Sequence, residues 1–255
     1  MEAGKAALGA ALVLSAILLA AGFVWYSELG ADEFREFHVA VEMLTVLAGL
    51  AVFYFAYTSY AAEKNVRVLL IALAFLAMAV FDIFHTYAFT EIDRPHTITA
   101  INTSIYFWLA ARVGGAILLG MAFLLPGRTL GERFGKAVFA ATLVLIPLAA
   151  FAILENATEP FLPQMFVYGQ GLTQLKVALE AFAAALYALC AFAAFRIWQK
   201  NGEEIAIMFA AGLVFMAYSG LALMLYSSPY DSFMVIGHVF KLLAFGAFLY
   251  AALEH

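Results

Sequence analysis

The chain has 255 residues, of which 66% are hydrophobic and 12% are charged, and its formal net charge is −5. Soluble domains carry about 25% charged residues, so this composition predicts a polytopic membrane protein with little chain left for a soluble domain. The acidic balance offers no basic surface to nucleic acid. A single cysteine, Cys190, excludes an intramolecular disulfide and a multi-cysteine metal site.

Apolar segments long enough to cross a bilayer, which takes about 20 residues, follow one another along the chain. They cover residues 6–27, 37–61, 68–90, 100–125, 136–154, 172–198, 205–227 and 233–252. The first segment follows Lys5 as a signal peptide would, but its apolar run exceeds the usual core of about 7–15 residues. We therefore predict an all-α fold, a single multi-pass bundle of about eight transmembrane helices over residues 1–252 in the plasma membrane.

The loops between these segments are short, except for residues 155–171. That stretch contains prolines, glycines and aromatic residues, and we expect it to pack on the membrane surface. Residues 253–255 read Leu-Glu-His, as the beginning of a vector-encoded tag does. We expect them to be a tag remnant at a point where the natural protein was cut.

Lysine and arginine gather in alternate loops, which predicts the orientation of the bundle. Eight of them fall at the N-terminus and in the second, fourth and sixth loops: Lys5, Lys64, Arg67, Arg128, Arg133, Lys136, Arg196 and Lys200. Only Arg35 and Arg94 fall in the other loops, where acidic residues are frequent. Both termini are therefore predicted to be cytoplasmic. His96 lies in a predicted outer loop and is expected to be solvated.

Ionisable residues interrupt five of the predicted helices: His38, Glu42, Asp82, His85, Arg112, Lys176, Glu180, His238 and Lys241. Where a helix carries two of them, they are three or four residues apart and so share one face. Charged groups at membrane depth are costly and usually face a bundle interior. We therefore predict a ligand-binding site formed by His38, Glu42, Asp82, His85, Trp108, Arg112, Glu180, His238 and Lys241. At about 1.5 Å of rise per residue, all of the ionisable residues lie in the outer half of the bundle or near its midplane.

The shallower part of this set combines a carboxylate with imidazoles. Glu42, His85 and His238, together with His38, form a group that suits Zn, Fe, Ni or Cu. Asp82 and Glu180 would then orient the imidazoles. Two of the histidines could instead be axial ligands of a haem, and each could also be a hydrogen-bonded core residue.

The deeper part pairs the acids Asp82 and Glu180 with the bases Arg112 and Lys241. Because buried ions need partners, these four predict a charge-balanced network that fixes helix positions. Trp108 lies four residues before Arg112, so its indole is expected to stack on the guanidinium.

Three motifs in successive helices resemble the membrane-associated sensor family MASE3. They are Phe37-His38-xxx-Glu42, Asp82-Ile83-Phe84-His85-Thr86 and Trp108-Leu109-Ala110-Ala111-Arg112. The resemblance implies a multi-helix membrane module that precedes a cytoplasmic output domain, such as a histidine kinase of a two-component system or a diguanylate cyclase. It also implies that His38, Glu42, Asp82, His85, Trp108 and Arg112 are positions typical of the family.

From these observations we predict a sensory input domain, not itself an enzyme, that binds a metal ion, haem or small ligand in a polar cavity. It would signal to a cytoplasmic output domain and work as a homodimer. One alternative is an intramembrane metal hydrolase acting on a lipid amide, with metal-bound water as nucleophile and Glu42 or Asp82 as general base. A second alternative is a haem-binding electron carrier.

Overall fold

The computed structural model describes residues 2–90, 97–125, 129, 132–156 and 162–254. Within these residues the chain forms eight helices and one hairpin of two short strands. The helices are α1 (Glu2–Val24), α2 (Ala31–Glu63), α3 (Val66–Thr90), α4 (Thr97–Leu124), α5 (Glu132–Asn156), α6 (Gln174–Asn201), α7 (Glu204–Leu223) and α8 (Ser232–Leu253). Each is long and apolar enough to span a membrane, which confirms the predicted all-α, multi-pass fold.

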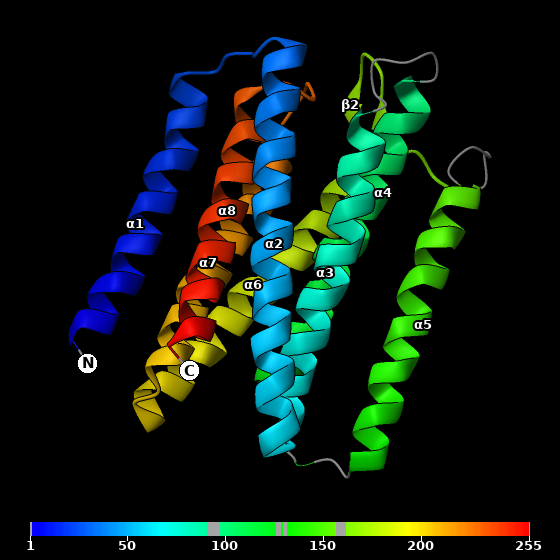
Figure 1. Cartoon of the computed structure of the whole chain (residues 1–255). Coiled ribbons are helices and arrows are strands. Elements are labelled where there is room, and N and C mark those ends of the chain that lie inside the picture. The colour runs from blue at the N-terminus through cyan, green and yellow to red at the C-terminus, as the bar shows by residue number, and fades with distance from the viewer. Residues whose placement is uncertain (1, 91–96, 126–128, 130–131, 157–161, 255) are drawn as a thin grey trace.

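Among the described residues, six helices close into a ring. Neighbouring pairs pack in the order α2, α3, α4, α6, α7 and α8, and α8 then packs against α2. The other two helices lie outside the ring: α1 contacts α7 and α8, whereas α5 contacts α3 and α4 (Figure 1). The ring therefore has an interior that is shielded from lipid, and polar side chains at membrane depth can be placed there.

Both termini lie toward the lower end of the bundle in Figure 1, where α2 and α6 also end. We call this the basic end, because all described lysines and arginines outside the ring interior except Arg35 gather there. The residues at the basic end are Lys5, Lys64, Arg67, Arg133, Lys136, Arg196 and Lys200. Arg94, His96, Arg128 and His255 lie outside the described residues, so the expectations for them stay predictions.

Several helix boundaries differ by a few residues from the sequence prediction, and the end of α7 has a clear physical reason. The helix expected to reach residue 227 ends at Leu223, and the chain then turns back toward α8. The reason is Asp231, whose carboxylate is buried and accepts hydrogen bonds from the amides of Ser227 and Ser228 on one side and of Phe233 on the other. A helical continuation past Leu223 would forfeit this cap, which typically stabilises a helix by about 1 kcal/mol.

The loop between α5 and α6 contains a hairpin that the sequence analysis missed. Strand β1 (Phe166–Val167) pairs with β2 (Gly171–Leu172). Glycines adopt positive φ within the turn and directly after it, +76° at Gly169 and +85° at Gly171. The side chain of Asn102 on α4 holds the hairpin: it donates to the Phe166 carbonyl and accepts from the Phe166 amide. This contact fixes the hairpin to α4.

Close packing inside the ring gives a direct test of the helix arrangement. A Cβ built on Gly237 of α8 would lie 2.5 Å from Leu223 Cγ, whereas one on Gly246 of the same helix meets no atom within 4 Å. We expect Gly237→Ala to destabilise the protein by about 1–3 kcal/mol, because the α7–α8 contact must open. Gly246→Ala is the control, and its higher helix propensity should leave the melting temperature unchanged or raised. Equal melting temperatures for the two variants in detergent would contradict the packing described.

Candidate metal centre

Three histidines and a glutamate meet in the ring interior. His38 and Glu42 lie one turn apart on α2, His85 comes from α3 and His238 from α8. His38 and Glu42 have no solvent exposure, and His85 and His238 are also buried. Packing of α2 against both α3 and α8 brings together residues that are up to 200 positions apart in the chain.

The donor atoms of these residues are spaced as metal ligands could be. The Nε2 atoms of His38 and His85 are 3.1 Å apart, and His238 Nε2 lies 3.5 Å from Glu42 Oε1. One donor atom from each of the four residues lies within 4.8 Å of all the others. In a tetrahedral site with bonds of about 2.0–2.1 Å, neighbouring ligand atoms are roughly 3.4 Å apart. Small side-chain rotations would therefore bring these four donors onto one ion.

Backbone carbonyls orient two of the imidazoles. His85 Nδ1 lies 2.8 Å from the Ser104 carbonyl oxygen, and His238 Nδ1 lies 2.7 Å from the Met234 carbonyl oxygen. A carbonyl only accepts hydrogen bonds, so each Nδ1 carries the proton and each Nε2 keeps its lone pair. Metal-binding histidines are commonly held in this way.

The prediction that Asp82 and Glu180 orient the imidazoles is wrong. Asp82 binds Lys241 instead, and Glu180 accepts a 2.6 Å hydrogen bond from the indole of Trp108. The physical reason is that both carboxylates are drawn to buried cations and donors, while each ring finds a carbonyl nearer to it. For His238 that carbonyl belongs to its own helix, four residues earlier.

Several buried polar atoms in the described part of the chain have no hydrogen-bond partner, and three of them belong to this centre. They are His38 Nδ1, Glu42 Oε1 and His238 Nε2. An unpaired buried polar atom costs about 1–3 kcal/mol, so native proteins rarely leave one without a function or a ligand. The Glu42 and His238 atoms are the pair 3.5 Å apart, and both face the same space.

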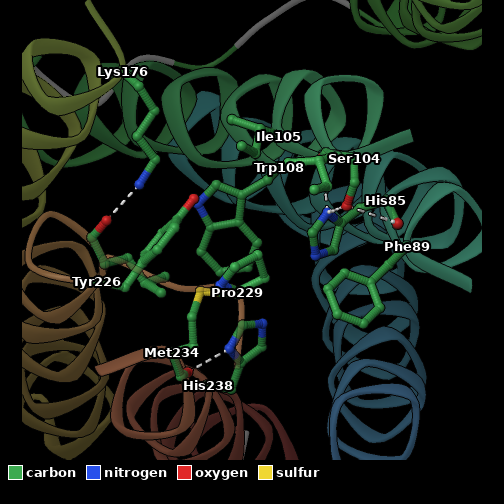
Figure 2. A pocket seen from close by; sticks show the side chains of 12 residues that line it. His85, Phe89, Ser104, Ile105, Trp108, Lys176, Tyr226, Pro229, Met234 and His238 are labelled. Carbon is green, nitrogen blue, oxygen red and sulfur yellow. Dashed lines mark hydrogen bonds between the residues drawn. The ribbon is translucent and has the colours of Figure 1, made fainter. Parts of the chain in front are cut away.

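A small cavity adjoins the centre, with His85 and His238 in its wall (Figure 2). Its volume is about 40 Å³, which is room for on the order of two or three water molecules. Trp108 lies between the two histidines, with ring centroids 5.3 Å from His85 and 5.5 Å from His238. An ion at the centre would therefore have space for a water molecule or another small ligand beside two of its imidazoles.

Lys241 of α8 connects the centre to the deeper charges. Its ammonium group lies 2.6 Å from Glu42 Oε2 and 2.8 Å from Asp82 Oδ2, and 4.7 Å from the centre of the Trp108 ring. Lys241 and its two carboxylate partners are almost fully buried. One lysine thus ties α8 to both α2 and α3, and Glu42 divides its two oxygens between Lys241 and the histidines.

Glu180 of α6 forms the other half of the network. Its carboxylate lies 3.2 Å from Lys176 Nζ and 3.9 Å from Arg112 Nε. The Arg112 guanidinium stacks on Trp108 at 5.3 Å, as predicted, and donates to the Met216 carbonyl oxygen of α7 at 2.7 Å. Within the described residues, three buried acids in the ring interior face three buried bases: Glu42, Asp82, Glu180, and Arg112, Lys176, Lys241.

The sequence analysis missed several residues that complete the site. Ser104 and Met234 orient imidazoles, Phe89 stacks on His38 with centroids 3.9 Å apart, and Tyr187 donates to the Arg112 carbonyl oxygen and lies beneath its guanidinium. Ser104 stands out as a polar residue in an apolar segment, but serine is common there. A backbone carbonyl leaves no signal in the sequence.

Comparison with protein families decides what kind of module this is. The MASE3 family, described as a membrane-associated sensor domain, matches residues 29–255. The chain belongs to the MASE3 family. The match confirms the resemblance based on three motifs and starts after α1, so the ring of six helices lies within it. Comparison with curated proteins and with solved structures found no significant match.

As a MASE3 domain, the chain is a multi-pass membrane sensor module, a description that supports a non-enzymatic role. The three motifs occupy one connected region of the ring interior. The first supplies His38 and Glu42, the second supplies Asp82 and His85, and the third supplies Trp108 and Arg112. Glu180 of α6, together with His238 and Lys241 of α8, connects this region to the other helices of the MASE3 ring.

Proposed function

We propose that this MASE3 domain senses a divalent first-row transition metal ion, of which Zn²⁺ is the reference case, with Fe, Ni and Cu as further candidates. His38, His85, His238 and Glu42 would hold the ion. The observation that carries the proposal is the convergence of four buried donor atoms, including an unpaired Nε2 of His238 and an unpaired Oε1 of Glu42. Three nitrogens and a carboxylate oxygen form a donor set that Zn²⁺ commonly takes.

An ion fits these residues better than the other expected ligands. The Nε2 atoms of His38 and His85 are 3.1 Å apart, so a porphyrin has no room between the rings. The adjoining cavity of about 40 Å³ is far smaller than a haem and suits water or a very small molecule. The geometry therefore favours metal over haem, and a sensor over a haem-based electron carrier.

The hydrolase alternative requires a carboxylate that is free to act as general base. Lys241 holds one oxygen of Glu42 and one of Asp82, at 2.6 and 2.8 Å. An ammonium ion so close holds both carboxylates in ion pairs, so neither is free to take a proton from a water molecule. The same contacts are useful to a sensor, because they connect the centre to three helices.

The distribution of basic residues supports a cytoplasmic location for the basic end. The centre would then lie in the outer half of the bundle, and α8 would run from it toward the cytoplasm. A MASE3 module in this orientation could pass a signal through α8 to a cytoplasmic output domain, such as a histidine kinase or a diguanylate cyclase. Dimerisation of that output domain would make the sensor a homodimer.

Lys241 is the residue that we propose transmits occupancy. An ion bound to Glu42 Oε1 would place two positive charges a few ångströms from the Lys241 ammonium group, which holds Glu42 Oε2. At an effective dielectric constant near 20, unit charges at about 4 Å interact by about 4 kcal/mol, so the repulsion is substantial. The Lys241 ammonium group would move toward Asp82, and α8 would move with it. Only an ion that binds the two helix arrangements unequally can produce such a signal.

The proposal is tested by metal titration of the purified protein. We expect protein stripped with a chelator to take up one equivalent of Zn²⁺ and to gain about 2.7 kcal/mol of stability when free Zn²⁺ reaches 100 times Kd. Mg²⁺ at the same concentration is the control, since it prefers oxygen ligands and should neither bind nor stabilise. A failure of Zn²⁺, Fe²⁺, Ni²⁺ and Cu²⁺ to bind would overturn the metal proposal, and a Soret band in the isolated protein would point to haem.

A further inference from the structure

At the basic end the ring of helices opens into a largely apolar crevice. Its lining residues lie ten or more positions from the nearest residue of the candidate metal centre on the same helix. Its volume is about 440 Å³. Side chains of α2, α3, α7 and α8 form its walls, among them Phe55, Ile71, Phe209 and Ala252. Most of the wall is apolar, although Ser59, Asn65, Arg67 and three glutamates also line it. An acyl chain is the apolar occupant that a bilayer supplies.

A basic hollow adjoins the crevice. It is lined by Arg67, Arg196 and Lys200 together with two amide side chains, and its volume is about 550 Å³. Arg67 and Ile197 line both spaces, so the apolar and basic regions meet at these residues. The arrangement follows the outline of a phospholipid, with an apolar part next to a charged one.

The guanidinium of Arg67 is fixed at this junction. Its Nε donates to the Ala122 carbonyl oxygen at the end of α4, at 3.0 Å, which leaves the two terminal nitrogens to bind an anion. Arg196 and Lys200 are exposed at the end of α6. In the described part of the chain, none of the three forms an ion pair.

Acidic residues also occur nearby, and their positions matter for the charge of the site. Glu63, Glu203 and Glu204 line the crevice, but the basic hollow is lined by none of them. Glu203 accepts a 2.6 Å hydrogen bond from the Asn201 side chain. The hollow therefore presents cationic and neutral polar groups to a ligand, which favours a phosphate.

We propose that the crevice and the hollow together bind one anionic phospholipid. Its phosphate lies among Arg67, Arg196 and Lys200, and part of an acyl chain enters the crevice. Basic pockets between transmembrane helices are known to suit anionic headgroups, whose attraction grows with each nearby lysine or arginine. Because Ala251 and Ala252 of α8 line the crevice, the lipid contacts the last turn of that helix. The lipid site is separate from the metal centre and does not depend on it.

The test is lipid retention by the detergent-purified protein, measured by native mass spectrometry. Phosphatidylglycerol and phosphatidylcholine with identical acyl chains are added to delipidated protein at equal concentrations. We expect one phosphatidylglycerol molecule to remain bound, and Arg196→Gln combined with Lys200→Gln to weaken its binding roughly 10- to 30-fold. Arg133→Gln is the control, because Arg133 is an exposed arginine at the same end that lines neither space. Both substituted residues are exposed, so we expect each variant to fold, and circular dichroism checks this.

A second variant separates the acyl chain from the headgroup. Ala56→Phe narrows the crevice but leaves the hollow intact, and we expect it to weaken binding of phosphatidylglycerol without creating binding of phosphatidylcholine. Equal retention of the two lipids would overturn the proposal, as would an equal loss of binding in Arg133→Gln. Displacement of phosphatidylglycerol by inorganic phosphate at comparable concentration, with no effect of Ala56→Phe, would also overturn it and identify a site for free phosphate.

Discussion

His85→Ala and His238→Ala should each lower the affinity of the protein for Zn²⁺ by more than about 100-fold. Loss of a residue that only orients a ligand costs about 10–100-fold, and these substitutions remove the ligand atoms themselves. The two imidazoles are held by different carbonyl oxygens on different helices, so each loss is a separate test of the same centre. Zn²⁺ titration with a competing chelator measures the change directly.

Substitutions of one further histidine and of one serine provide controls for this experiment. His96→Ala changes a histidine outside the described residues that is predicted to lie in an outer loop, and it should leave Zn²⁺ affinity unchanged. Ser104→Ala removes a hydroxyl 2.9 Å from His85 Nδ1 but keeps the Ser104 carbonyl, so we expect a smaller loss than for His85→Ala. If both His85→Ala and His238→Ala retain full affinity, the four residues do not form a metal centre, and their polar groups are structural or serve an organic ligand.

Lys241→Met should destabilise the domain by about 3–5 kcal/mol. The substitution leaves Glu42 and Asp82 buried without the cation that lies 2.6 and 2.8 Å from them. Removing one partner of a buried ion pair costs this much because the remaining charge has neither water nor a counter-ion. The melting temperature of the metal-free protein in detergent is the appropriate measurement, since it does not depend on the metal proposal.

A compensating variant separates charge from packing. Adding Glu42→Gln and Asp82→Asn to Lys241→Met removes the uncompensated carboxylates at nearly constant volume, so most of the lost stability should return. Lys200→Met is the matched control, because Lys200 is exposed at the end of α6 and its loss should change stability by less than about 0.5 kcal/mol. A Lys241→Met variant as stable as Lys200→Met would contradict the buried network, and a failure of the triple variant to recover would assign the role of Lys241 to packing.

The charge network explains why an apolar ring tolerates so many ionisable groups. The three buried acids and three buried bases of the ring interior balance, and Lys241 and Glu180 each contact more than one partner. Breaking any single contact exposes a charge in a medium that cannot solvate it. Such a network fixes the relative positions of α2, α3, α6 and α8, and the four residues of the candidate metal centre lie on three of these helices.

Much of the fold followed from the sequence alone. Apolar segments of membrane-spanning length predicted all eight described helices, because a bilayer requires each spanning helix to satisfy its own backbone and to face lipid with apolar side chains. Pairs three or four residues apart, such as His38 with Glu42 and Asp82 with His85, predicted that ionisable residues share helix faces. The three motifs predicted the MASE3 family, which the match over residues 29–255 confirmed.

The order of helices around the ring was decided only by the tertiary structure. Sequence spacing places residues on a helix face but does not say which helix that face meets, so the partners of each ion could not be assigned. Lys176 and Glu180 lie four residues apart on one helix, so their ion pair could be predicted from the spacing. The pair of Lys241 and Glu42 joins residues 199 positions apart and could not. The carbonyls of Ser104 and Met234, which orient His85 and His238, depend on helix packing and rotamer and have no sequence signature. The sequence thus determined which residues are polar at membrane depth, and the packing of α2 against α3 and α8 decided which of them meet.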